Sequence, residues 1–261
     1  MKKHLIRVYE FVCLISPPVI LTPILKLLVA LKFSMQFMTL EKTLKKNFQL
    51  KGIAKSKTAY LLATGPSIKR KDLSLLKGQD CFSVSNFYLH HDIQIIAPKF
   101  HFFAPFHPPL NLENYLDWLK EADATLPPET SIVLSVSGKQ MIEENSIFKE
   151  RDIFYLCLEK RPIFGYCNLL TPIMAPQSSP LMVLPVLAYM GYTKIILVGC
   201  DHTILRDYKS VVKNFYDPTH DSRENATNGD NWKDGIIKHL ENAHTVFQQY
   251  KFYQAKFKEN N

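Results

Sequence analysis

The 261-residue sequence lacks several features that would assign a protein class directly. It has no low-complexity tract and no internal repeat. Its five cysteines form no C-x-x-C pair and leave one over when paired, so a reducing cytoplasm fits better than a disulfide framework. With 46% hydrophobic and 12% aromatic residues, the chain can bury one substantial core, as one globular domain plus an appendage.

Both common phosphate-binding loops are also absent. The segment from Tyr60 to Ser67 is apolar and then small and hydroxylated, which indicates a buried strand and a turn at Gly65 that opens a helix, about Ile68 to Leu76. It has neither the Lys-Ser/Thr of a Walker loop nor the third glycine of a dinucleotide fingerprint, so neither an ordinary ATPase nor an NAD enzyme is supported. The turn is a candidate anion site in which helix N–H groups would face a phosphate, and Ser67 would cap the helix or donate to the ligand. A plain strand-to-helix turn is the alternative.

The charge pattern narrows the partners. The net charge of +8 suggests an anionic partner, such as a membrane, a nucleic acid or a phosphorylated metabolite. Because the basic residues are scattered and not interleaved with aromatics, we expect no nucleic-acid partner. We also expect no metal site, since His90 and His91 would point to opposite faces of a strand and His239 and His244 are five apart on a helix.

The first forty residues form a separate segment. Phe11 to Leu31 is apolar, but prolines and Lys26 interrupt it and no small-x-small cleavage site follows. Its longest uncharged run is about 15 residues, against the roughly 20 that a spanning helix needs. We therefore interpret residues 1–40 as a re-entrant or interfacial helical anchor on the inner-membrane surface. A domain-packing helix and a true single span are the alternatives.

After a basic linker at 41–57, residues 58–261 alternate short apolar runs with helical patterns. This alternation predicts an α/β fold with a Rossmann-like, mostly parallel sheet flanked by helices. The expected strands are Thr58–Ala63, Cys81–Ser85, Phe100–Ala104, Ser131–Val136, Asp152–Leu156 and Lys194–Gly199. The expected helices are Leu112–Ala122, Lys139–Asn145, Ser179–Met190 and Trp232–Lys256, with a loop or broken segment over Arg161–Pro180.

Two regions of this domain are expected to meet a ligand. In open α/β sheets the ligand lies beyond the carboxyl ends of the strands, which draws attention to Gly65–Ser67, Asn86, residues 106–108 and Gly199–His202. The segment 201–232 is irregular but rich in aromatics, which favours a lid that orders over a ligand rather than disorder.

Four segments taken together resemble a known group. They are Ala63–Ser67, Asp72–Leu76, Ser85–Tyr88 and Gly191–Asp201. Over about Thr58 to Tyr250, the chain resembles the bacterial sialyltransferases that decorate lipooligosaccharide, and their wider relatives among motility-associated and pterin-pyrophosphokinase-like proteins. The resemblance implies an inverting, metal-independent glycosyltransferase that takes a CMP-linked sugar, has no cofactor and works on a glycan or lipid-linked acceptor. It further implies a bacterial protein at the cytoplasmic face of the inner membrane.

The resemblance also implies residue roles. Thr64, Gly65, Pro66 and Ser67 would lie in the nucleotide loop, with Thr64 in place of the family's usual asparagine. A second nucleotide asparagine matches Ser85 or Asn86, of which we favour Asn86, and another position is occupied by Ala104. The family's Thr-Ser-Gly turn matches Ser178, Ser179 and Pro180. The remaining implied residues are Tyr208 and Tyr216 for the donor phosphate and His220 as general base.

The chemistry of these residue types agrees with inverting transfer. A neutral imidazole suits the abstraction of a proton from an acceptor hydroxyl. His220 lies between Asp217 and Asp221, and His202, directly after Asp201 at a strand end, is the rival base. Tyrosine hydroxyls, lysines and a helix N-terminus can stabilise the leaving phosphate without a cation.

Two other functions remain open from the sequence. One is a pterin-type pyrophosphokinase, which would need magnesium and a carboxylate ligand such as Asp201. The other is a catalytically degenerate nucleotide-binding scaffold, supported by Thr64, Ala104 and Pro180. Self-association is a further expectation, because a missing strand would leave an open sheet edge.

Overall fold

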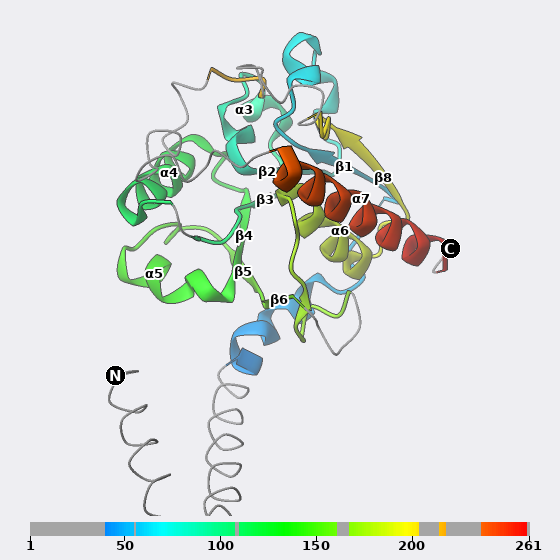
Figure 1. Cartoon of the computed structure of the whole chain (residues 1–261). Coiled ribbons are helices and arrows are strands. Elements are labelled where there is room, and N and C mark those ends of the chain that lie inside the picture. Colours follow the sequence, from blue (N-terminus) through cyan, green and yellow to red (C-terminus); the bar gives the residue numbers. More distant parts are fainter. Residues whose placement is uncertain are drawn as a thin grey trace, which may run out of the picture. The chain divides into compact units, whose positions relative to one another are not determined.

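A six-stranded parallel sheet forms the middle layer of the fold in the computed structural model (Figure 1). The strand order is β5-β4-β3-β2-β1-β8, and every pairing within it is parallel. The strands are β1 (Thr58–Leu62), β2 (Cys81–Val84), β3 (Phe100–Phe102), β4 (Ser131–Ser135), β5 (Ile153–Leu156) and β8 (Lys194–Val198). The α/β class and the six predicted strands are therefore confirmed.

The structure describes residues 40–54, 56–107, 110–160, 167–203, 214–217 and 236–259. Contacts divide the chain into two compact units, Met1–Thr43 and Leu44–Asn261. The interfacial anchor expected over residues 1–40 lies outside the described residues except for Leu40. Over the part of the chain that is described, no helix combines the length and apolar character needed to cross a membrane.

Helices cover both faces of the sheet, because its strands are apolar on both sides. Side chains alternate along β1, so that Ala59 and Leu61 enter one core while Leu62 enters the other. The first core includes side chains of α6 (Ser179–Met190) and α7 (Ile236–Glu259). The second includes side chains of α3 (Ile93–Ile96), α4 (Leu112–Thr125) and α5 (Lys139–Glu144). The result is a three-layer helix–sheet–helix arrangement (Figure 1).

The prediction of a single helix over Ile68 to Leu76 is wrong. Two short 3-10 helices, η2 (Pro66–Arg70) and η3 (Ser74–Leu76), replace it, and Lys71 between them is extended. The Asp72 carboxylate accepts the Ser74 N–H at 3.0 Å, a local hydrogen bond that competes with a continuous helix.

Other boundaries also differ from the prediction. A two-stranded parallel sheet, β6 (Leu158–Glu159) with β7 (Ile173–Met174), lies partly in the segment that was expected to be a loop. Helix α6 has the predicted bounds and continues through Pro185, whereas α7 is described from Ile236 and the predicted start at Trp232 lies outside the described residues. The remaining short helices are η1 (Lys45–Leu50), η4 (Ser85–Leu89) and η5 (Val136–Gly138).

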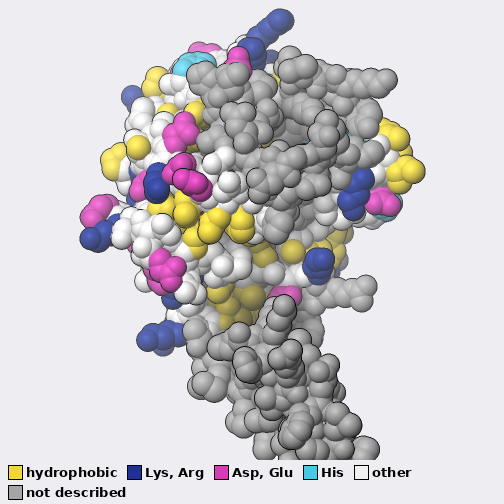
Figure 2. Space-filling model, turned by 60° about the vertical axis from the view of Figure 1, so that its left-hand side comes forward, with side chains coloured by type: hydrophobic (Ala, Val, Ile, Leu, Met, Phe, Trp, Pro, Cys, Tyr) yellow, Lys and Arg dark blue, Asp and Glu magenta, His cyan; other side chains and the backbone are white. Residues whose placement is uncertain are grey.

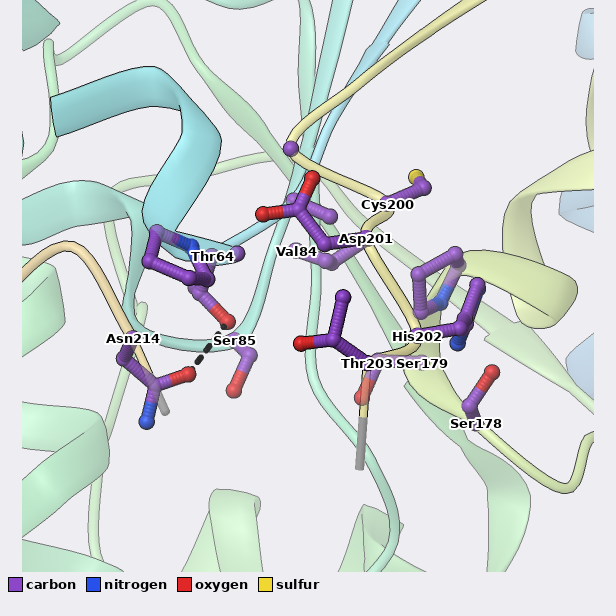
Figure 3. A pocket seen from close by; sticks show the side chains of 15 residues that line it. Thr64, Val84, Ser85, Ser178, Ser179, Cys200, Asp201, His202, Thr203 and Asn214 are labelled. Carbon is purple, nitrogen blue, oxygen red and sulfur yellow. Dashed lines mark hydrogen bonds between the residues drawn. The ribbon is translucent and has the colours of Figure 1, made fainter. Parts of the chain in front are cut away.

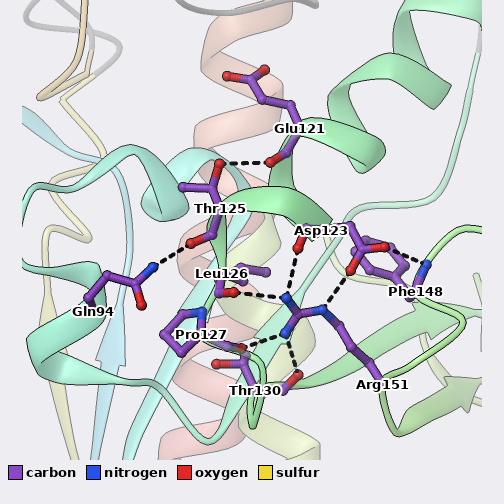
Figure 4. Close-up of polar contacts among 9 residues, drawn as sticks. All are labelled: Gln94, Glu121, Asp123, Thr125, Leu126, Pro127, Thr130, Phe148 and Arg151. Atoms are coloured by element: carbon purple, nitrogen blue, oxygen red, sulfur yellow. Dashed lines mark hydrogen bonds and ion pairs between the residues drawn. The ribbon is translucent and has the colours of Figure 1, made fainter.

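A buried arginine near the amino ends of β4 and β5 holds the neighbouring segments together by hydrogen bonds (Figure 4). The Arg151 guanidinium donates to the Asp123 carboxylate at 2.6 Å, and the side chain is only 7% exposed. Its other N–H groups donate to four carbonyl oxygens at the end of α4 and in the loop after it, those of Asp123, Leu126, Pro127 and Thr130. The second oxygen of Asp123 accepts the Phe148 N–H at 2.9 Å, so this network is fully paired.

Candidate functional site

A cavity of about 370 Å³ lies at the carboxyl ends of β1, β2 and β8 (Figure 3). The chain passes from β1 to β2 on one side and returns to β8 on the other, so the strand order reverses at β1. Such a reversal leaves a crevice outside the strand ends, where open α/β sheets bind ligands. The described lining residues are Ala63, Thr64, Gly65, Pro66, Val84, Ser85, Ser178, Ser179, Pro180, Gly199, Cys200, Asp201, His202, Thr203 and Asn214.

Two glycines let the loops after β1 and β8 touch at the cavity wall. The Gly65 N–H donates to the Gly199 carbonyl at 2.8 Å. A Cβ at Gly65 would lie 2.5 Å from that carbonyl, and a Cβ at Gly199, whose φ is +71°, would lie 2.5 Å from the Ala63 carbonyl. Both positions therefore need glycine, one for close approach and one also for its backbone conformation.

Asp201 joins the same two loops through its carboxylate. One oxygen accepts the Ser67 N–H at 2.7 Å, and the other accepts the Ser67 hydroxyl at 2.5 Å. The amides of Gly65 and Ser67, which the sequence suggested would face a phosphate, thus already donate to protein oxygens. The anion at the start of η2 is the Asp201 side chain, and the β1 turn serves as a loop clamp.

A buried histidine holds Ser85 at the cavity wall. Ser85 has a φ of +56°, rare for a residue other than glycine, and its carbonyl accepts from His101 Nε2 at 2.8 Å. Because a carbonyl only accepts, Nε2 carries the ring proton, and Nδ1 accepts the Ser83 hydroxyl at 2.7 Å. His101 is fully buried, and burial lowers the pKa of its imidazole to about 3. A neutral imidazole therefore fixes the strained turn.

The N-terminus of α6 opens on the cavity with its capping position unused. Ser178 is the N-cap residue and makes no side-chain capping hydrogen bond. Its Oγ is buried without any hydrogen-bond partner, although it lines the cavity. Ser179 lines the same wall. The α6 dipole and a free buried hydroxyl together make this wall suitable for a phosphate.

His202 also lines the cavity, and its side chain is held from α7. Its Nε2 and the Tyr250 hydroxyl are 2.8 Å apart, and the Tyr250 hydroxyl also hydrogen-bonds the Cys200 thiol. When Tyr250 donates its proton to sulfur, His202 Nε2–H donates to Tyr250, and Nδ1 is left as the ring acceptor. Burial lowers the pKa of His202, opposed by the Asp201 carboxylate, so the ring is neutral at pH 7. Burial also raises the pKa of the Cys200 thiol to about 12.

A short piece of the expected lid borders the cavity. In residues 214–217, the Phe215 N–H donates to the Thr64 carbonyl at 3.0 Å, and Thr64 Oγ1 donates to Asn214 Oδ1 at 3.2 Å. The Phe215 ring packs against Phe87 and His90. The other residues of 204–232 lie outside the described residues.

The structure places the sequence-suggested residues unevenly. Those that line the cavity are Thr64, Gly65, Pro66, Ser178, Ser179, Asp201 and His202. Asn86 is fully buried behind it, where its Oδ1 accepts the Trp118 indole N–H at 2.6 Å, and the neighbouring Ser85 lines the cavity instead. Tyr216 is not among the lining residues and packs edge to face on Phe215. Tyr208 and His220 lie outside the described residues.

Several lining residues had no signal in the sequence. Thr203 and Asn214 lie in an irregular stretch without a recognisable motif. Tyr250, which does not line the cavity but contacts His202, is one aromatic among several on a long helix. Tyr250 reaches His202 because α7 crosses the strand end.

One group of potential metal ligands occurs among the described residues, contrary to the expectation of no compact ligand set. His90, His91 and Asp92 bring one ligand atom each to within 4.8 Å of one another. The histidines follow η4 instead of lying in a strand, and their rings stack with centroids 4.4 Å apart. His90 Nδ1 already accepts the Asp92 N–H at 3.2 Å, so this nitrogen is occupied. This geometry fits a packed histidine pair better than a metal centre.

Figure 2 shows the charge on one face of the molecule. There, Lys and Arg side chains lie among Asp and Glu side chains instead of gathering in one basic patch. Interspersed charge of this kind is typical of a solvated surface.

No protein-family model matches the chain, and none of the curated proteins matches it. Among solved structures, the chain is similar to the sialyltransferase CstII from Campylobacter jejuni, solved in complex with a substrate analogue, CMP-3FNeuAc. The two are 14% identical with a TM-score of 0.41, over 78% of this chain and 79% of the other.

Proposed function

We propose that the chain is a glycosyltransferase that binds a nucleotide-activated sugar, CMP-linked, in the cavity at the ends of β1, β2 and β8. The observation that carries the proposal is one cavity that joins an uncapped helix N-terminus, at Ser178, to a neutral imidazole, at His202. The first feature suits a phosphate and the second suits a proton acceptor.

The donor phosphate would bind at the start of α6. Ser178 Oγ and the Ser179 hydroxyl supply neutral donors there, and the α6 dipole supplies positive potential. As the bond between the sugar and the phosphate oxygen breaks, negative charge grows on that oxygen. The helix terminus stabilises this charge where it develops.

His202 would act as the general base for the acceptor. In the tautomer in which Nε2–H donates to Tyr250, Nδ1 takes the proton of the acceptor hydroxyl as that oxygen bonds to the sugar carbon. Attack from the face opposite the departing phosphate inverts the configuration. Tyr250 positions the ring and is not among the residues that line the donor cavity. His220 remains the alternative base, and Tyr208 and Tyr216 remain proposed phosphate ligands.

The pyrophosphokinase alternative is less well supported by the donor set. Magnesium prefers several oxygen ligands, with one or more carboxylates dedicated to it. Asp201 is the one carboxylate among the described lining residues, and each of its oxygens accepts a hydrogen bond from Ser67. We therefore propose a metal-independent reaction. The scaffold alternative has no such observation in its favour.

The setting of the reaction follows from the sequence. The apolar segment 1–40 would hold the enzyme at the inner-membrane surface of a bacterial cell, on the cytoplasmic side, beside a lipid-linked or cell-surface glycan acceptor. Self-association and a lid over 201–232 belong to the same proposal.

The test is a donor survey of the full-length protein. Calorimetry with CMP, UMP and ADP should give heat with CMP, and hydrolysis of CMP-sugars should persist in EDTA. ATP turnover abolished by EDTA would replace the proposal with the pyrophosphokinase. Silence with every nucleotide would leave a scaffold. Ser178→Ala should weaken CMP binding, whereas Ser137→Ala, at a distant strand end, should not.

A further inference from the structure

We infer that a second cavity, along the outer strand β8, binds the hydrocarbon chain of an amphiphilic acceptor whose reacting hydroxyl lies at His202. The inference rests on the proposed function and adds the class of acceptor to it. It is carried by an apolar groove that shares two residues with the donor cavity.

The groove has a volume of about 600 Å³ and lies between β8 and α7. It extends from Thr193 to Cys200, which for an extended chain is roughly 23 Å. A site of this volume and length accommodates a long, narrow ligand. The residues lining it are Leu184, Thr193, Ile195, Leu197, Cys200, His202, Phe247, Tyr250, Lys251, Tyr253, Gln254 and Phe257.

Within the part of the chain that the structure describes, the groove has exposed apolar side chains. Leu197 on β8 is 45% exposed and Phe247 on α7 is 55% exposed, and both line the groove. β8 is the outermost strand on this side of the described sheet. A concentrated apolar surface next to a polar site indicates a ligand with an apolar part.

The groove and the donor cavity meet at His202 and Cys200, which line both. The donor cavity presents hydroxyls and a helix terminus, and the groove presents aliphatic and aromatic carbon. A molecule with its chain along β8 therefore places its polar end at the imidazole, which also lines the donor cavity. Transfer to a lipid-linked hydroxyl requires a donor site, a base and an apolar groove that adjoin in this way.

A second copy of this chain is a less suitable occupant. An outer strand recruits another strand through its backbone N–H and C=O groups, along the sheet edge. The exposed carbon here lies on the face of β8 beneath α7, as the lining by Ile195, Leu197 and Phe247 shows. A narrow chain fills such a channel better than a strand does.

The experiment uses full-length protein in lipid nanodiscs and an alkyl glucoside that carries a diazirine at the end of a long alkyl chain. After irradiation, mass spectrometry should find the label in peptides covering 194–202 and 246–257. Phe247→Ser and Leu197→Ser should each lower labelling of these peptides about fivefold or more. Phe252→Ser is the matched control, since Phe252 lies on the same helix at 38% exposure and outside the groove, and it should keep wild-type labelling.

Two results would overturn the inference. One is wild-type protein that binds CMP normally but takes no label along the groove. The other is a Leu197→Ser variant that shifts the protein from dimer to monomer in sedimentation, which would assign the groove to a second copy. Groove labelling without any nucleotide binding would instead overturn the proposed function, so the two failures are distinguishable.

Discussion

The two ends of the parallel sheet carry polar networks of opposite character. At the amino ends of β4 and β5, Arg151 donates to a carboxylate and four carbonyl oxygens, and each group has a partner. At the carboxyl ends of β1, β2 and β8, the Ser178 hydroxyl is buried without a partner, and Ser85 and His202 have positive φ. In the first network every donor and acceptor named has a protein partner, whereas in the second the Ser178 hydroxyl has none.

This difference separates a structural network from a binding site. Buried polar groups normally find partners, and those left unpaired cost folding free energy that the rest of the structure must offset. Strained backbone likewise persists only where the surroundings enforce it, as His101 does for Ser85. Both features occur together in the cavity, which is why we assign the function there and not to the Arg151 cluster.

The largest expected effect is a loss of stability when the Arg151 network at the amino ends of β4 and β5 is broken. Arg151→Met should lower the free energy of unfolding by about 2–3 kcal/mol, because the partly buried Asp123 carboxylate and the carbonyls of the α4 end lose their donors. Urea denaturation followed by circular dichroism measures this. Lys120→Met removes an exposed ion pair on the same helix, at 3.1 Å from Asp117, and should cost less than about 1 kcal/mol. Equal losses of unfolding free energy in Arg151→Met and Lys120→Met would show that the Arg151 network stabilises the fold no more than an exposed ion pair does.

The next largest effect is expected on catalysis, at the cavity that His202 lines. His202→Ala should lower transfer by about a hundredfold with little change in stability, because the base is lost while the Tyr250 hydroxyl keeps its hydrogen bond to the Cys200 thiol. Initial rates with a CMP-sugar donor measure this. His244→Ala, on the exposed side of α7, is the control and should retain full activity. If His220→Ala, and not His202→Ala, abolishes transfer, then His220 is the base.

The strands and most helices could be predicted from the sequence because their signals are local. Each predicted strand is a short apolar run, buried in the inner strands and partly exposed in β8, and Ser179–Met190 is apolar nearly all round. The helix over Ile68 to Leu76 could not be predicted correctly, since the Asp72 side chain breaks it by bonding the Ser74 N–H. An Asp side chain can form this hydrogen bond or leave the helix intact, and the sequence alone does not say which occurs.

The sequence pointed to the ends of β1 and β8, where the candidate cavity lies, but not to how the residues there are arranged. The ends of β1 and β8 were identified, and the residues there do line the cavity. The pairing of Ser67 with Asp201 joins residues 134 positions apart, so no local pattern indicates it. Whether Ser85 or Asn86 faces the cavity depends on the φ of Ser85, which a histidine on another strand enforces. Tyr250 contacts His202 only because α7 packs across the sheet.

Acid should weaken the cavity region through His101. Its folded pKa of about 3 is below the ordinary value of 6.5, so the unfolded chain binds a proton that the folded chain excludes. The free energy of unfolding should therefore fall with falling pH below about 6.5, with a slope of about 1 kcal/mol per pH unit from this residue. Urea denaturation between pH 4.5 and 6.5, comparing wild type with His101→Gln, isolates its share. Parallel curves for the two proteins would remove His101 from this role.

The smallest effects are expected at two helix N-caps. The Asn111 side chain makes a capping hydrogen bond, and the Ser178 side chain does not. The Asn111 side chain caps α4 by accepting the Glu113 N–H at 2.9 Å, so Asn111→Ala should cost about 1 kcal/mol of stability. Ser178 at α6 makes no such bond, and Ser178→Ala removes an unpaired buried hydroxyl. Its thermal unfolding temperature should stay the same or rise, while CMP binding measured by calorimetry weakens by up to about tenfold. A destabilised Ser178→Ala protein with unchanged CMP affinity would mean that this serine serves the fold, and the contrast between the two ends of the sheet would then lose its main support.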